Sequence, residues 1–306
     1  MKKLLYIPLD YHIHSETGVF DSMLNGFKTE FDALIFKNLE ESIEFNPDYV
    51  FMHGNAISIE DCNILKSSTG AIFTIWVGDV RYAPLTEAMN MIGVADLYLF
   101  PFNGKQLEYF SRILDTPCEY LFEVFDDRQV REVEEITTGR VVFVGNVYDH
   151  FPGGEERISL ANFIGKYVPE LELYGSFPYS ANAKGSIDFS KVPDLYNTSY
   201  LTIAHNNRND IEGYFTHRNL IALASGSCVL MKHFPGIEEF FTNWEHCVFY
   251  RNNYELLDVI EFLKRTPTQR NKIARSGNEY VRNNYMNSNF ANKYHQILKR
   301  WNTKNM

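Results

Sequence analysis

A basic side chain and the start of a short helix come together around Arg218. Thr216 is a typical N-cap residue, the apolar run Ile221–Ala224 predicts the body of the helix, and Gly226 fits the position after it, where a positive φ costs little. The free backbone amides of a first helical turn attract negative charge, and Arg218 lies in that turn. This combination predicts an anion site, and a phosphate-bearing ligand is the first candidate.

Other side chains near this helix could complete such a site. His217 could contact the same phosphate groups, or it could serve only in packing. Glu238 and Glu239 follow Pro235 and Gly236 at the predicted start of another helix. A carboxylate can accept from two sugar or ribose hydroxyls at once, but acidic residues are also favoured at helix starts by the helix dipole. The residues alone leave both interpretations open.

Polar residues also follow the predicted strands of the first half of the chain. Parallel strands bring their carboxyl ends to one edge of a sheet, which is where ligands bind in such folds. Asp79 could act as a general base toward a hydroxyl group of a ligand, or it could cap a helix or pair with Arg81. His14 and His53 are further candidate catalytic bases. The candidates for binding the molecule that carries this hydroxyl are His12, Asn55 and Arg81.

In the second half of the chain, the residues after the predicted strands are candidates for binding the phosphate-bearing ligand. Gly145 and Asn146 end one strand, and the glycine would let the backbone approach a phosphate, although an ordinary turn would also explain it. Tyr174 and His205 end neighbouring strands and could frame a nucleoside.

Alternating strand and helix patterns predict an α/β fold with mostly parallel sheets. In the first half, strands are predicted over 3–8, 33–36, 49–52, 71–77 and 97–100, with helices over 19–28, 58–67 and 104–114. In the second half, strands are predicted over 141–144, 171–174, 201–204, 229–231 and 247–250.

A charged stretch without an apolar stripe, residues 125–139, interrupts this alternation. The predicted division is therefore a first domain over 1–128, a linker over 129–139, a second domain over 140–285 and a final helix over 286–306. The final helix is predicted from apolar residues at helical spacing, which are Phe290, Tyr294, Ile297, Leu298 and Trp301.

Composition excludes several classes of protein. The net charge of −10 over 306 residues disfavours a general nucleic-acid binder, and no apolar run is long enough to predict a membrane span. The apolar start of the chain is too short for a signal peptide and is interpreted as a strand. Four scattered cysteines without CxxC spacing argue against a zinc site or a disulfide framework. The expected location is the cytoplasm, of a bacterium or of an infected host if the protein is viral.

The segment from 140 to about 285 resembles group-1 glycosyltransferases, and within them the spore-maturation CgeB-like branch. The resemblance lies in Thr216, Arg218, the run Ala222–Gly226 and the run Pro235–Glu239, with further matches at Phe143–Asn146, Leu173–Gly175, Tyr254–Leu257, Arg275–Gly277, Tyr280 and Val281. It implies the GT-B architecture, in which two Rossmann-like α/β domains face a central cleft and a C-terminal helix crosses back to the first domain.

The resemblance also implies an activity: metal-independent transfer of a hexosyl or pentosyl group from a nucleotide-diphosphate sugar, with UDP expected, to an acceptor hydroxyl. No cofactor is implied beyond this co-substrate. Arg218 would clamp the diphosphate, an acidic residue near Glu238 or Glu239 would face the donor, and Asp79 fits a Trp-x-x-Asp stretch of the family. The acceptor could be a glycan, a protein or a hydroxylated DNA base, which some compact viral GT-B enzymes modify.

One departure from the family pattern bears on activity. Many group-1 enzymes carry two glutamates seven residues apart, whereas this chain has Gly213 and Ile221 at those positions. The usual acidic contact to the donor ribose is therefore missing. The alternative function is a catalytically degenerate module that binds a sugar nucleotide or a nucleic acid. The residues do not define an oligomeric state.

Overall fold

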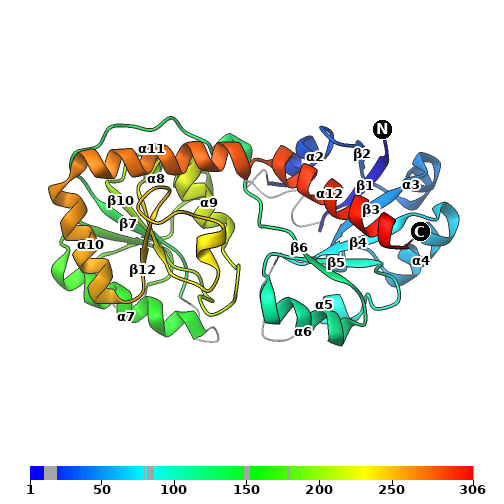
Figure 1. The fold of residues 1–306 in the computed structure, drawn as a ribbon, viewed down its shortest axis with the longest axis horizontal. Helices are drawn as coiled ribbons and strands as arrows, with labels where there is room; N and C mark the ends of the chain where they lie inside the picture. Colours follow the sequence, from blue (N-terminus) through cyan, green and yellow to red (C-terminus); the bar gives the residue numbers. More distant parts are fainter. Residues whose placement is uncertain (10–18, 79, 81–85, 148–151, 178–179, 306) are drawn as a thin grey trace. The chain divides into compact units, whose positions relative to one another are not determined.

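The computed structural model describes residues 1–9, 19–78, 80, 86–147, 152–177 and 180–305. The chain forms two compact units (Figure 1), one from Met1–Asp127 with Met286–Met306 and the other from Arg128–Tyr285. Each unit contains one six-stranded sheet with parallel pairing between the described strands. Of the predicted acceptor-side residues, His12, His14, Asp79 and Arg81 lie outside the described residues.

The sheet of the first unit has the strand order β2-β1-β3-β4-β5-β6, so the order reverses between β1 and β3. Its strands are β1 (Lys3–Ile7), β2 (Asp32–Ile35), β3 (Tyr49–His53), β4 (Ile72–Trp76), β5 (Leu97–Phe100) and β6 (Cys118–Tyr120). The central strands β3 and β5 are buried along their whole length, as expected for a parallel sheet covered on both faces. The five predicted strands are confirmed, and β6 was not predicted because it has three half-buried residues and no apolar run.

The final helix completes the first unit, as predicted. Its helices are α2 (Val19–Phe27), α3 (Leu39–Phe45), α4 (Ile59–Thr69), α5 (Thr86–Met89), α6 (Gly104–Leu114) and α12 (Asn287–Asn305). Gly26 in α2 lies directly against α12, because a Cβ there would be 2.4 Å from the carbonyl oxygen of Asn287. Asn287 Nδ2 donates to the Phe125 carbonyl at 2.7 Å, and the buried Tyr294 hydroxyl lies 2.8 Å from Thr74 Oγ1. The end of the chain is therefore part of the core of this unit.

The sheet of the second unit has the order β12-β11-β10-β7-β8-β9, which reverses between β7 and β10. Its strands are β7 (Val141–Val144), β8 (Leu171–Tyr174), β9 (Ala183–Gly185), β10 (Leu201–Ala204), β11 (Val229–Lys232) and β12 (Val248–Tyr250). The five predicted strands are confirmed. The edge strand β9 is exposed along its length and carries no apolar pattern, so the sequence did not predict it.

The helices of the second unit are α7 (Pro152–Tyr167), α8 (Val192–Asn197), α9 (His217–Ala224), α10 (Asn253–Arg265) and α11 (Pro267–Asn284). Helix α9 packs against α8 and α11, while α7 packs against α10, and the two groups cover opposite faces of the sheet (Figure 1). The predicted stop of α9 is confirmed, because Gly226 has a φ of +75° and its Cα faces Val133.

Residues 129–139, the predicted linker, lie in the second unit. The backbone N–H of Arg131 donates to the Ala224 carbonyl at 3.0 Å, and Arg282 donates to the Arg131 carbonyl at 2.9 Å. Ion pairs join Arg131 to Asp194 and Arg282 to Glu132. The segment is thus held by polar contacts, which an apolar periodicity does not report.

Candidate functional site

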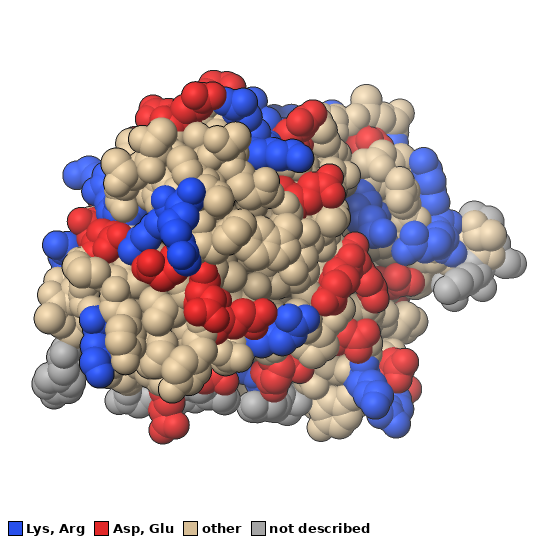
Figure 2. Space-filling view, turned by 60° about the vertical axis from the view of Figure 1, so that its left-hand side comes forward, with Lys and Arg blue, Asp and Glu red and all other residues tan. Residues whose placement is uncertain are grey.

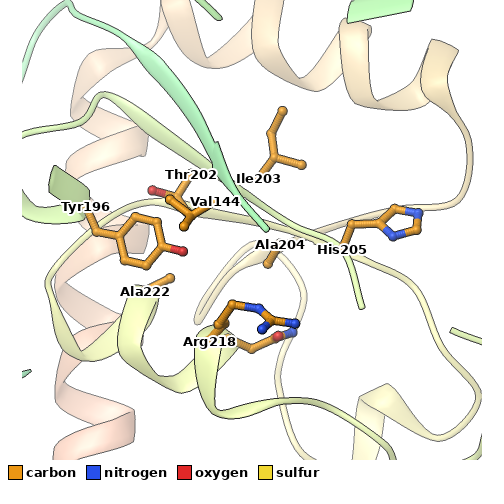
Figure 3. Close-up of a pocket in the computed structure, with 9 residues that line it drawn as sticks. Val144, Tyr196, Thr202, Ile203, Ala204, His205, Arg218 and Ala222 are labelled. Carbon is orange, nitrogen blue, oxygen red and sulfur yellow. The ribbon is translucent and has the colours of Figure 1, made fainter. Parts of the chain in front are cut away.

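A small cavity lies where the strand order of the second sheet reverses, between the carboxyl ends of β7 and β10; we call this place the donor crevice. The volume of the cavity is about 10 Å³, roughly the room of one water molecule. The cavity is lined by Val144, Tyr196, Thr202, Ile203, Ala204, His205, Arg218, Asn219 and Ala222 (Figure 3). Ligands of open α/β sheets bind outside such a reversal point. The cavity is therefore the bottom of a candidate site rather than the whole of it.

The two loops that flank the crevice are fixed by a buried arginine of α7. Arg157 is 1% exposed, and its guanidinium donates to the carbonyl oxygens of Asn146 at 2.6 Å and of His205 at 2.5 Å. It therefore joins the ends of β7 and β10 directly. This role could not be predicted from the sequence, because the two carbonyl groups come from separate strands and converge only in the folded unit.

Gly145 and Asn146, both predicted to bind the donor, form a tight contact with the next loop. A Cβ at Gly175, whose φ is +110°, would be 2.1 Å from the carbonyl oxygen of Gly145. The Asn146 side chain accepts from the backbone N–H of Ser176 at 3.1 Å. The close approach at Gly175 and the hydrogen bond from Ser176 to Asn146 hold the loop close to the strand end.

Thr216 occupies the N-cap position of α9, but its hydroxyl makes no capping bond. The hydroxyl instead lies 3.2 Å from Asn206 Oδ1 and 3.0 Å from Asn219 Oδ1, so the expected capping bond is wrong. The hydroxyl therefore donates toward two buried side-chain amide oxygens and does not accept from a helix amide. Both asparagines are 1% exposed, and their Nδ2 groups have no partner among the described residues.

Arg218 is half-buried at the start of α9. Within the described part of the chain, no hydrogen bond or ion pair joins its guanidinium to another residue, and no residue accepts from the backbone N–H of His217 or Arg218. These groups and the two asparagine amides are all hydrogen-bond donors. Such a cluster is complementary to an anion with several oxygens, such as a phosphate group.

The two histidines predicted here differ in their surroundings. Burial, with a smaller contribution from the Arg218 charge, lowers the pKa of His217 to about 3, so the ring is neutral at pH 7. Burial also lowers the pKa of His205, although Glu156 opposes this from 3.2 Å. The His205 ring points away from Tyr196 in Figure 3, and its Nδ1 lies 2.8 Å from the Asn206 carbonyl. Neither histidine adds positive charge to the site at neutral pH.

The remaining donor candidates lie further from the cavity. The Tyr174 hydroxyl donates to Glu172 at 2.9 Å. Glu238 and Glu239 lie in a single 3-10 turn, Ile237–Glu239, rather than at the start of a longer helix. Glu238 Oε1 lies 3.0 Å from His233 Nε2. This turn reaches the segment before α9 because the Gly213 N–H donates to the Pro235 carbonyl at 2.9 Å.

In the first unit, His53 ends β3 inside an aromatic cluster. The ring is 3% exposed, its Nε2 lies 3.2 Å from the Tyr6 hydroxyl, and it contacts the rings of Phe20 and Trp76. A base at this position would need neighbouring rings to move before it met an acceptor. Asn55 is exposed in the turn that follows. Within the described ranges, no cluster of His, Cys, Asp or Glu is arranged as a metal site, and no helix is long and apolar enough to span a membrane.

Several solved structures share this fold. HepE (Alr3699) from Anabaena, solved with UDP and glucose, superposes with a TM-score of 0.64 at 11% identity over 98% of this chain and 100% of its own. Sucrose-phosphate synthase from Thermosynechococcus elongatus gives 0.65 at 10% over 99% and 100%. The β-glucosyltransferase of phage T4 gives 0.64 at 12% over 98% and 99%.

At the level of sequence, a search among curated proteins finds no match. The model of the family described as glycosyl transferase-like matches residues 129–296, which is more than half of the chain and includes α9 and the whole second sheet. This chain therefore belongs to the glycosyl transferase-like family and has the GT-B fold of glycosyltransferases.

Proposed function

We propose that this protein transfers a sugar from a nucleoside diphosphate sugar to an acceptor hydroxyl, and that the second unit binds the donor. The observation that carries the proposal is a set of donors that have no partner among the described residues: the Arg218 guanidinium and the first amides of α9, with the side-chain amides of Asn206 and Asn219 beside them. HepE, which shares the fold, has been solved with UDP and with UDP-glucose, which supports UDP as the nucleotide.

The donor groups would act on the leaving group. As the acceptor oxygen bonds to the anomeric carbon, the bond from that carbon to the β-phosphate oxygen breaks, and the nucleoside diphosphate leaves with the electron pair. Arg218 and the helix amides would stabilise the charge that develops on this oxygen. We propose that these groups neutralise the diphosphate without a metal ion, that either a hexose or a pentose is transferred, and that the residue pattern around α9 belongs to the CgeB-like branch.

Acceptor binding is assigned to the first unit. Asp79 is proposed as the base that takes the proton of the acceptor hydroxyl, with His14 and His53 as further candidates and His12, Asn55 and Arg81 as binding residues; of these, the described residues include His53 and Asn55.

Figure 2 shows basic and acidic side chains interspersed on the face it presents, so this face offers no continuous basic surface for a polyanion. The proposed location is the cytoplasm.

The test is release of nucleoside diphosphate from a panel of UDP-, GDP- and ADP-sugars, with and without acceptor pools of glycans, protein and hydroxylated DNA. Arg218→Ala should slow release by about 100-fold or more, whereas Arg265→Ala should not, because Arg265 is an exposed residue at the end of α10. If nucleotides bind but no acceptor pool supports release, the alternative of a non-catalytic binding module replaces this proposal; Gly213 and Ile221 are the residues that favour it.

A further inference from the structure

Tyr196 places a buried hydroxyl in the floor of the donor crevice. The residue lies in α8 and is 2% exposed, and no described residue forms a hydrogen bond with its hydroxyl. Figure 3 shows the hydroxyl end of the ring pointing into the cavity beside Ala222, toward Arg218. Because the residue lines the cavity and its hydroxyl is not bonded to a described residue, the hydroxyl can bond with a group that enters the cavity. Burial raises the pKa of Tyr196, so the hydroxyl keeps its proton at neutral pH.

The chemistry of this hydroxyl differs from that of its neighbours. Arg218 and the Nδ2 of Asn219 can only donate, which suits a phosphate oxygen. A phenol hydroxyl both donates and accepts, which suits another hydroxyl group. The cavity of about 10 Å³ has room for a single oxygen atom with its hydrogen, and not for a sugar ring. The group that fits is therefore a hydroxyl projecting from a ring that stays outside the cavity.

The position of the Tyr196 hydroxyl beside α9 indicates which hydroxyl this is. Ala222, next to the Tyr196 hydroxyl, is four residues after Arg218, which is roughly 6 Å along α9 from the start of the helix that would hold the phosphates. In a nucleoside diphosphate, the ribose hydroxyls lie within such a distance of the α-phosphate.

We propose that Tyr196 is a specificity-determining residue whose hydroxyl bonds a ribose hydroxyl of the donor, so that the site prefers ribonucleotides over deoxyribonucleotides. This inference rests on the proposed function, because it requires a nucleoside diphosphate at the start of α9. It adds a residue that the sequence did not predict and a prediction about the sugar of the nucleotide itself.

The test is a binding cycle measured by calorimetry on the full-length protein. The ligands are the best-binding of UDP, GDP, ADP and CDP, together with its 2′-deoxy and 3′-deoxy forms. The wild type should bind one deoxy form about five- to tenfold more weakly than the parent, the size expected for one hydrogen bond. Tyr196→Phe should bind the parent more weakly by the same factor, and should bind that deoxy form as the wild type does.

The matched control is Tyr200→Phe, which removes a buried hydroxyl bonded to the Leu263 carbonyl and should leave all affinities unchanged. Equal weakening of the parent and both deoxy forms by Tyr196→Phe would mean that the hydroxyl meets a phosphate, and would overturn the inference, as would no weakening at all. These results differ from failure of the proposed function, in which the wild type binds none of the four diphosphates or Arg218→Ala binds them equally well.

Discussion

The two sheets of this molecule each reverse their strand order. The reversal point of the first sheet is filled by side chains, whereas that of the second sheet contains a cavity. In the first unit, the ends of β1 and β3 carry Tyr6 and His53, which bond to each other among packed aromatic rings. In the second unit, the ends of β7 and β10 leave a cavity, and the donors around Arg218 have no partner among the described residues. The shared topology therefore indicates where a site could lie in each unit. Hydrogen-bond donors without partners then indicate in which of the two units a ligand is expected.

The largest expected effect comes from removing the charge of Arg218 at the reversal point of the second sheet. Arg218→Ala should lower kcat/KM by about 100- to 1,000-fold, roughly 3–4 kcal/mol of transition-state stabilisation, because the leaving diphosphate loses its principal cation. Steady-state kinetics of the mutant and of Arg265→Ala measure this. Activity within threefold of the wild type would remove Arg218 from the account.

Arg157 should matter next, through the stability of the second unit. Arg157→Met would leave the carbonyls of Asn146 and His205 without their buried donor, at a cost of about 3 kcal/mol in the free energy of unfolding. Urea unfolding measures this cost. Arg157→Lys keeps the charge but cannot reach both carbonyls with a planar fork, so an intermediate loss is expected. Equal stability of all three proteins would show that the two hydrogen bonds of Arg157 contribute nothing to the stability of the second unit.

Acid should weaken the second unit through His217. The folded pKa of about 3 lies below the unfolded value of 6.5, so the unfolded state takes up the proton first and stability falls as the pH drops below about 6.5. Between pH 6.5 and pH 5 the loss is at most about 2 kcal/mol, since the ring keeps part of its surface in water. His217→Gln should remove this part of the pH dependence of unfolding, and an unchanged profile would contradict the lowered pKa.

The smallest expected effect lies at the reversal point of the first sheet, which is filled by side chains. Tyr6→Phe removes one buried hydrogen bond to His53 and should cost about 1 kcal/mol of stability. It should leave the affinity for nucleoside diphosphates unchanged. Thermal unfolding and calorimetry on the same sample test both halves, and a large loss of nucleotide affinity would mean that the two reversal points are not as different as their side chains indicate.

The elements of this fold were predictable because their signals are local. The buried strands are apolar runs, α9 begins after Thr216 and ends before Gly226, and the last helix carries its apolar residues at helical spacing. The edge strand β9 was missed because its exposed backbone pairing leaves no apolar pattern. The segment over 129–139, predicted as a linker, is held within the second unit by polar contacts, which leave no apolar pattern either.

The site was only partly predictable. Arg218 could be identified because a cation at a helix start is a local feature. His53 and His205 both lie at strand ends and could not be told apart in sequence, since their burial among different partners is a tertiary property. Arg157, Asn219 and Tyr196 lie inside helices, and only the folded unit shows what their polar atoms face.

The most direct test of the donor site is amide chemical-shift mapping of the isotope-labelled protein during titration with UDP. Saturable shifts are expected for the backbone amides of His217 and Arg218 and for the Asn219 side-chain amide. The amide of His53 should not shift. Shifts centred on His53 with none at the start of α9, or no saturable shift at either place with any of the four nucleoside diphosphates, would contradict it.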